Sequence, residues 1–160
     1  MANRITVLGF LIFIGLGASP LMAQNQCPTL ADNHAERGWR FLHAGQIDQA
    51  EAAFRSALID CPRNLVGQVG RGYVDIERGN LDAALVRFET VIARDSTDTG
   101  AIAGRGIARW RQGDVDGAKE AFDTVLRLDA NYPVALEYLT KINQPPRQPL
   151  PPPYHPDPQD

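Results

Sequence analysis

The middle of the chain repeats itself every 34 residues, and no other feature of the sequence constrains the fold as strongly. Six columns between residues 31 and 132 hold the same residue type three times at this spacing. They are Arg37/Arg71/Arg105, Gly38/Gly72/Gly106, Gly45/Gly79/Gly113, Asp48/Asp82/Asp116, Ala50/Ala84/Ala118 and Phe54/Phe88/Phe122. A period of this length indicates a solenoid, in which each repeat is one supersecondary unit that stacks on the next. We therefore expect three stacked units rather than a single globular core.

Each repeat predicts two helices joined by a tight turn. Gly45 and its equivalents follow a segment of helix length, and glycine most readily adopts the left-handed conformation that ends a helix. Asp48, three positions later, is suited to cap the next helix. In that second helix Ala50, Phe54 and Leu58 are spaced at i, i+4 and i+8, which places them on one helical face.

One further helix is expected after the third repeat, at residues 133–143. Pro133 suits the first turn of a helix. Val134, Tyr138 and Ile142 recur at intervals of four residues and so share one face. A solenoid needs a terminal element that covers the apolar face of its last unit. We assign residues 133–143 to this capping role.

The repeat columns resemble those of the tetratricopeptide repeat (TPR) family. The framework of Gly38, Ala50 and Phe54, together with the closing Pro62, matches the signature of that family. The resemblance divides residues 31–132 into TPR-like repeats at 31–64, 65–98 and 99–132. It implies an all-α fold, a right-handed α-solenoid of three helix-turn-helix repeats followed by the capping helix.

Several polar residues depart from the family pattern. Asp75 and Arg109 stand where the family favours an aromatic residue, Arg71 and Arg105 where it favours an aliphatic one, and Gln68 where it favours a large hydrophobic one. Stacked first helices would bring Asp75 within reach of several guanidinium groups. Either these side chains are solvated at a repeat seam, where such pairs contribute about 0–1 kcal/mol, or they form a partly buried ladder that sets the register of the repeats.

The amino-terminal segment has the pattern of a secretory signal peptide. Residues 1–23 combine Arg4 near the start, an apolar stretch from Ile5 to Gly17 and a small-residue region that ends at Ala23. The apolar stretch is shorter than the roughly 20 residues of a membrane-spanning helix. Cleavage after Ala23 is therefore favoured over an uncleaved membrane anchor. We expect an exported protein, in the periplasm of a Gram-negative cell or otherwise secreted.

The two cysteines, Cys27 and Cys61, are expected to form a disulfide bond. Cys27 lies in a lead-in at 24–30 and Cys61 at the end of the second helix, so an antiparallel hairpin places both at the same end. The equivalent positions of the other repeats hold Asp95 and Asp129, so the repeat itself does not require a cysteine there. An exported protein meets an oxidising compartment, in which such a bond persists.

Composition and motifs argue against catalysis, cofactors and nucleic-acid binding. The chain has 16 Lys and Arg against 19 Asp and Glu, a net charge of −3, and no basic block that could neutralise phosphates. It lacks a zinc-protease motif, a phosphate-binding glycine loop and a nucleophile elbow. His34 and His43 lie nine residues apart on one expected helix and cannot share a metal ion without other ligands. We predict no enzyme activity, no cofactor and no metal.

The first helices of the repeats carry an apolar and aromatic stripe. By resemblance to the family, its columns face a concave groove in which partner peptides lie. The candidate groove residues are Trp39, Leu42, His43, Val69, Tyr73, Ile76, Glu77, Ile107, Trp110 and Arg111. Trp and Tyr supply large contact areas with a hydrogen-bonding edge, which suits an apolar peptide or helix. Alternatively, the stripe is buried between the stacked helices.

These features predict a non-enzymatic protein–protein interaction scaffold of the cell envelope with an unidentified protein or peptide partner. The groove lacks the Lys and Asn set with which some members of the family hold a terminal carboxylate, so we do not expect that mode of binding. Two alternatives stay open. One is a structural module that self-associates into a homo-oligomer through the same stripe, and the other is an accessory subunit of an envelope-assembly machine.

Residues 144–160 are expected to form an extended, disordered tail. Eight of the 12 prolines of the chain lie between Pro145 and Asp160. Proline lacks the N–H group that a helix requires and favours the polyproline II conformation. The tail is either a spacer or a ligand of the aromatic groove, within one molecule or between two.

Overall fold

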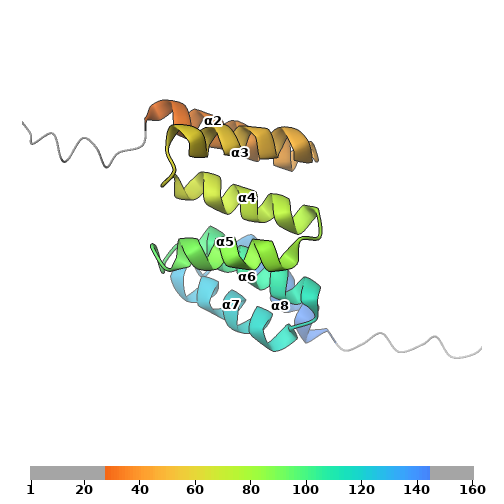
Figure 1. Ribbon diagram of the computed structural model, residues 1–160. Coiled ribbons are helices and arrows are strands. Elements are labelled where there is room, and N and C mark those ends of the chain that lie inside the picture. The colour runs from red at the N-terminus through yellow and green to blue at the C-terminus, as the bar shows by residue number, and fades with distance from the viewer. Residues whose placement is uncertain (1–27, 145–160) are drawn as a thin grey trace, which may run out of the picture.

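The structure is a computed structural model that describes residues 28–144. Within this range the chain forms helices and no strand. The helices are α2 (Thr29–His43), α3 (Ile47–Asp60), α4 (Leu65–Glu77), α5 (Leu81–Ile92), α6 (Thr99–Gln112), α7 (Val115–Leu128) and α8 (Pro133–Asn143). Figure 1 shows them stacked from α2 and α3 at one end to α7 and α8 at the other. The predicted all-α solenoid is confirmed.

Three sequence predictions concern residues outside the described range. They are the signal peptide at 1–23, the participation of Cys27 in a disulfide bond, and the proline-rich tail that follows Gln144. Of the expected lead-in at 24–30, the structure describes Pro28 onward. These features therefore stay predictions.

Each repeat reverses direction at a glycine in the left-handed conformation. Gly45, Gly79 and Gly113 have φ angles of 72°, 77° and 86°, as the turn column predicted. A Cβ atom added at any of the three would meet no atom within 4 Å. The backbone conformation, rather than a lack of space, therefore favours glycine at these turns.

The aspartates three positions after these glycines, Asp48, Asp82 and Asp116, lie in the first turns of the second helices and do not cap them, so that prediction is wrong. In the first repeat the second helix begins at Ile47, which places Asp48 inside its first turn. A carboxylate there still interacts favourably with the positive end of the helix dipole. Asp48 also accepts a hydrogen bond of 2.7 Å from Arg78 at the end of α4. One repeat further on, Asp82 accepts the equivalent bond from Gln112 at 2.7 Å.

Side-chain caps instead fix the starts of the first helices in repeats two and three. Asn64 accepts a hydrogen bond of 2.7 Å from the backbone N–H of Gly67 and donates one of 3.0 Å to Asp32 on α2. Asp98 accepts at 2.8 Å from the backbone N–H of Ala101. Because Asn64 is buried, its cap also ties the start of α4 to the preceding repeat.

Each phenylalanine of the repeat column packs against first helices at positions without a side chain. Phe54 is fully buried, and its ring contacts Gly38 of its own repeat and Gly70 of the next. Phe88 has the equivalent pair of glycine contacts one repeat further on. A Cβ atom at any of these glycines would lie less than 3 Å from ring carbons. The close approach of the first helices to each ring therefore depends on glycine.

The arginines of the first helices do not form the ladder considered from the sequence. Arg71 on α4 pairs with Glu51 on α3, with 2.9 Å between Nη2 and Oε1. Arg105 on α6 pairs with Glu89 on α5, with 3.2 Å between Nη1 and Oε1. Both arginines thus reach the second helix of the preceding repeat and still link neighbouring repeats, through glutamates rather than through Asp75.

A methyl group added beside a buried phenylalanine should destabilise the fold. We expect Gly70→Ala to lower the free energy of unfolding by about 1–3 kcal/mol, because the ring of Phe54 must move. Gly100→Ala is the matched control on the next first helix. Its added Cβ would lie 3.2 Å from a carboxylate oxygen of Asp98 and 3.6 Å from Val69, so no aromatic ring has to move. This control should change the free energy of unfolding by less than about 1 kcal/mol. Urea unfolding followed by circular dichroism measures both, and equal midpoints would contradict this packing.

Loss of the Asp75 carboxylate should also destabilise the stack. Asp75 accepts a hydrogen bond from Nε of Arg87 in its own repeat, and its side chain is 13% exposed. Asp75→Ala leaves that guanidinium group without its partner in a partly buried site, which should cost about 1–3 kcal/mol. Asp48→Ala removes a carboxylate that is 96% exposed and should leave the urea midpoint essentially unchanged. An unchanged midpoint for Asp75→Ala would mean that the buried pair contributes no net stability.

Candidate functional site

The first helices of the three repeats form one continuous surface, here named the first-helix face. It consists of the sides of α2, α4 and α6 that carry the candidate groove residues. Contacts run directly between α2 and α4 and between α4 and α6, and α8 continues the row. In Figure 1 the second helices α3 and α5 lie in front, with α2 and α6 behind them. The solenoid therefore keeps its first and second helices in separate layers.

The structure divides the candidate groove residues by burial. Val69, Ile76 and Ile107 are buried, at 4%, 1% and 7% exposure, and pack between the helices. Trp39, Leu42, Tyr73 and Trp110 are half-buried, whereas His43, Glu77 and Arg111 are exposed. The two interpretations of the stripe thus apply to different residues. The three aliphatic side chains belong to the seam, and the aromatic edges and the charges are at the surface.

Aromatic contacts connect the first two repeats beneath this face. The ring of Trp39 meets Phe54 edge-on at 5.5 Å and Tyr73 at 5.3 Å, measured between centroids. Tyr73 in turn meets Phe88 edge-on at 5.4 Å. Such edge-to-face geometry is the favoured arrangement of aromatic pairs. The rings of this face are therefore held in place by the core, with part of each left exposed.

At the other end of the face, Trp110 contacts the capping helix. Its ring meets that of Tyr138 on α8 at 6.4 Å, nearly at right angles. Tyr138 stacks on Phe122 at 5.0 Å. In the repeat alignment Tyr138 takes the place of Gly104, which contacts the preceding phenylalanine ring in the same way. The last repeat is thus closed by a ring where the earlier repeats use a glycine.

Tyr73 links two first helices through its hydroxyl group. Its O–H donates a hydrogen bond of 3.0 Å to the backbone carbonyl of Gly100 on α6. Burial raises the pKa of Tyr73 well above its usual value, and the nearby Tyr132 and Asp98 raise it further. Burial likewise raises the pKa of Tyr132. Both phenols therefore stay neutral at physiological pH, and Tyr73 acts as a permanent donor.

A charged pair borders the face at the ends of α4 and α6. Arg111 donates hydrogen bonds of 2.9 Å to the backbone carbonyl of Ile76 and to the carboxylate of Glu77. The first of these adds to the hydrogen bond of 3.1 Å that the backbone N–H of Gly79 donates to the same carbonyl at the end of α4. In the first repeat the same column holds His43, whose ring lies 5.9 Å from that of Trp39. Arg111 therefore supports the face structurally as well as bordering it.

Two residues of the face were absent from the sequence candidates. Val66 on α4 lies one turn before Val69 and is 50% exposed, which makes it the most exposed large hydrophobic residue of that helix. Tyr138 joins the face from α8 through its contact with Trp110. Extending the helical spacing of the stripe by one turn, from Val69 toward the start of α4, would have identified Val66. Tyr138 could not be identified from the repeat columns, because its place on the face depends on how α8 packs against α6.

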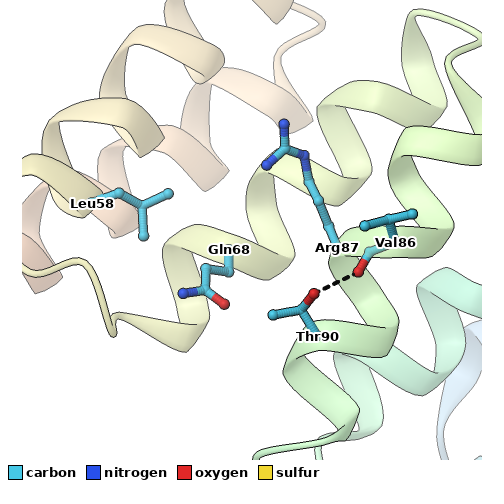
Figure 2. Close-up of a pocket in the computed structure, with 5 residues that line it drawn as sticks. All are labelled: Leu58, Gln68, Val86, Arg87 and Thr90. Atoms are coloured by element: carbon cyan, nitrogen blue, oxygen red, sulfur yellow. Dashed lines mark hydrogen bonds between the residues drawn. The ribbon is translucent and has the colours of Figure 1, made fainter.

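A separate pocket of about 250 Å³ opens among the helices α3, α4 and α5. Figure 2 shows the side chains that line it, with the hydroxyl of Thr90 bonded to the carbonyl of Val86 at 2.7 Å. The remaining lining residues are Leu58, Gln68 and Arg87. In the next repeat the equivalents of Gln68 and Arg87 are Ile102 and Ala121, and both are fully buried. The pocket therefore exists because polar residues replace the apolar seam at one repeat boundary.

The polar groups of this pocket are largely committed to the fold. Nε2 of Gln68 donates a hydrogen bond of 2.9 Å to the carbonyl of Pro62, which fixes the orientation of the amide. Oε1 of Gln68 is buried and has no hydrogen-bond partner. Nε of Arg87 is bonded to Asp75. The pocket thus offers a small, partly apolar opening with few free polar groups.

Other kinds of site find no support in the part of the chain that the structure describes. Among residues 28–144 no three His, Cys, Asp or Glu side chains gather as a metal ion would require. None of the described helices is both long and apolar enough to span a membrane. Nε2 of His34 lies 3.6 Å from a carboxylate oxygen of Asp60. Cys61 lies buried at the end of α3, at the position from which the predicted disulfide would start.

Comparisons with solved structures show the same fold. The second TPR domain of human RPAP3, in complex with the HSP70 peptide SGPTIEEVD, is 25% identical over 73% of this chain and 98% of that one, with a TM-score of 0.61. The first TPR of Spaghetti (RPAP3), bound to the HSP90 peptide SRMEEVD, is 24% identical over 71% and 90%, with a TM-score of 0.63. The Sgt2 TPR domain from Aspergillus fumigatus is 20% identical over 75% and 87%, also with a TM-score of 0.63.

The sequence comparisons agree with this fold. No curated protein matches the sequence. Residues 75–142 match the family model of the tetratricopeptide repeat, and these residues run from the second repeat into the capping helix. Taken with the repeated columns and the stacked hairpins, this match shows that the described chain has the fold of tetratricopeptide repeat proteins.

Proposed function

We propose that this protein is a non-enzymatic scaffold that binds an apolar peptide or helix on its first-helix face. The observation that supports this function is the row of half-buried side chains, Trp39, Leu42, Tyr73 and Trp110, on one side of a stack of helices. Tryptophan and tyrosine held in place by their neighbours are typical of residues that dominate binding energy. The similar RPAP3 domains are described with HSP90 and HSP70 peptides bound, which is the same class of interaction.

The charges near the face favour an apolar ligand over an acidic chain terminus. Arg111 is already bonded to the carbonyl of Ile76 and to Glu77. On α8, Lys141 is bonded to Glu137 at 2.6 Å. A carboxylate ligand would have to compete with these partners before it was bound. We therefore expect the exposed aromatic edges, rather than ion pairs, to supply most of the affinity.

We further propose that the scaffold works in the cell envelope. The support for this location is the signal-peptide pattern of residues 1–23 together with a cysteine pair, Cys27 and Cys61, that an oxidising compartment would keep bonded. A bridge that closes this loop could contribute about 4 kcal/mol by the chain-entropy model.

A charge placed on the first-helix face should abolish partner capture. Val66→Asp puts a carboxylate on this face, and we expect it to lose the partner because an apolar ligand cannot satisfy that charge. Val86→Asp is the matched control: it makes the same substitution at a 68% exposed valine that lines the pocket among α3, α4 and α5. Circular dichroism should show unchanged helicity for both variants.

Affinity capture from the envelope fraction, followed by quantitative mass spectrometry, compares these two variants with the wild type. The proposed site requires proteins that are retained by the wild type and by Val86→Asp and are lost with Val66→Asp. The opposite pattern would move the binding site to the pocket of Figure 2. Retention by both variants would contradict a binding role for either surface.

Export makes a prediction about the covalent state of the mature protein. Intact-mass analysis of protein purified from its source should show a chain that begins at Gln24. Thiol titration of the unfolded, non-reduced protein should find no free thiol. A chain that begins at Met1, or a count of two thiols, would contradict the proposed location or the proposed bond, respectively.

A further inference from the structure

Both tryptophans of the first-helix face keep an unused hydrogen-bond donor. Within residues 28–144 the indole N–H groups of Trp39 and Trp110 make no hydrogen bond, and neither nitrogen is among the buried polar atoms that lack a partner. Each indole edge therefore reaches solvent, while its ring is held by a neighbouring tyrosine. A fixed aromatic surface with a free N–H suits a ligand that combines apolar area with exposed carbonyl groups.

The described chain ends beside this face. On α8, Tyr138 contacts Trp110, and Ile142, one turn later, packs into the same core. Gln144 follows Trp110 by one repeat length of 34 residues. Gln144, the last described residue, therefore lies at the edge of the first-helix face rather than on the opposite side of the stack.

The sequence beyond Gln144 has the composition of a polyproline II ligand. Proline accounts for eight of the residues from Pro145 to Asp160. Proline-rich segments favour the polyproline II helix, whose carbonyl groups have no internal partner. Proteins recognise such segments with surfaces lined by aromatic side chains, and the preformed helix loses little entropy on binding. Tryptophan N–H groups are suitable donors for the free carbonyls.

We propose that the first-helix face binds proline-rich segments in the polyproline II conformation, and that residues 145–160 of the same molecule are its resident occupant. This partner class rests on the proposed function of the face. Three steps between neighbouring helices, of about 10 Å each, separate α8 from α2. Sixteen residues at about 3.1 Å each reach about 50 Å. The segment is thus long enough to pass Trp110 and reach Trp39 without a second copy of the chain.

The pocket among α3, α4 and α5 is a poorer site for such a segment. No aromatic side chain lines it. Nε of its Arg87 is bonded to Asp75, and the free oxygen of Gln68 is shielded from solvent and is an acceptor rather than a donor. A proline-rich ligand presents carbonyl groups, which are acceptors too, so the first-helix face is the complementary surface.

Two full-length variants separate the conformation of the segment from its charge. The first replaces Pro151, Pro152 and Pro153 by glycine, which breaks the longest run of prolines and weakens the polyproline II preference while keeping length and charge. The second combines Asp157→Asn with Asp160→Asn, which changes the charge and keeps every proline. Neither variant alters a residue of the helical stack, and circular dichroism should show the same helicity for both.

The measurement is the NMR chemical shift of each indole ¹H–¹⁵N signal. The variant Trp110→Phe assigns the two signals to Trp39 and Trp110. We expect the glycine variant to move both signals relative to the wild type and the asparagine variant to leave them in place. If the segment covers the face nine-tenths of the time, a captured partner should also bind the glycine variant about tenfold more tightly than the wild type.

Two results would overturn the proposal. Indole signals that are the same in the wild type and in the glycine variant would show that the segment does not cover the face. A difference that grows with protein concentration, together with a dimer in sedimentation, would assign the face to the segment of a second copy. In either case loss of partner capture by Val66→Asp would still support the proposed function, so the two proposals can fail separately.

Discussion

The stack depends on the contact between a phenylalanine ring and the helix backbone at glycine, where no side chain intervenes. Phe54 and Phe88 each lie against a glycine of their own repeat and a glycine of the next. Because the ring touches the backbone directly, it sets how closely consecutive first helices approach. The same spacing brings Trp39 on α2 within 5.3 Å of Tyr73 on α4. The geometry of the first-helix face is therefore a consequence of how the core is packed.

This dependence explains why the aromatic stripe serves two purposes. Its aliphatic members fill the seam between helices, whereas Trp39 and Trp110 pack one edge of their rings inward and leave another outside. Side chains that are already fixed lose little conformational entropy when a ligand arrives. A face built from seam residues is thus preorganised by folding itself. Substituting a tryptophan would therefore change core packing and ligand binding together. Substituting an exposed neighbour such as Val66 changes binding with little effect on packing.

The sequence predicted the elements whose chemistry is local and failed where an answer depends on two helices at once. Gly45 and its equivalents were identified because the positive φ of the turn is a property of one residue. The distance of Asp48 from Gly45 suits either a cap or a first-turn carboxylate. It is the latter, because the carbonyl of Gln46 accepts the first hydrogen bond of α3, from the N–H of Ala50.

Which side of the stripe is buried could not be predicted, because it depends on how far one helix is rotated against the next. Ile76 and Glu77 are neighbours in sequence, yet one is buried and the other exposed. The partners of Arg71 and Arg105 raise the same difficulty, because Glu51 and Glu89 do not occupy equivalent positions in their repeats. A repeat alignment finds only contacts that recur, and these two differ from one seam to the next.

The two repeat boundaries also differ in how strongly they hold. The apolar core forms one cluster that extends from Val69 to Ala135 across repeats two and three and the capping helix, and a smaller one of Ala50, Phe54 and Val74, which joins repeat one to α4. Between them, Gln68 and Arg87 stand where the next boundary has apolar residues. In a solenoid, stability is nearly the sum of each unit and its neighbouring interfaces. Repeat one is therefore the unit expected to open first, and Cys61 lies at its end, where a disulfide bond would support the unit that apolar packing holds least.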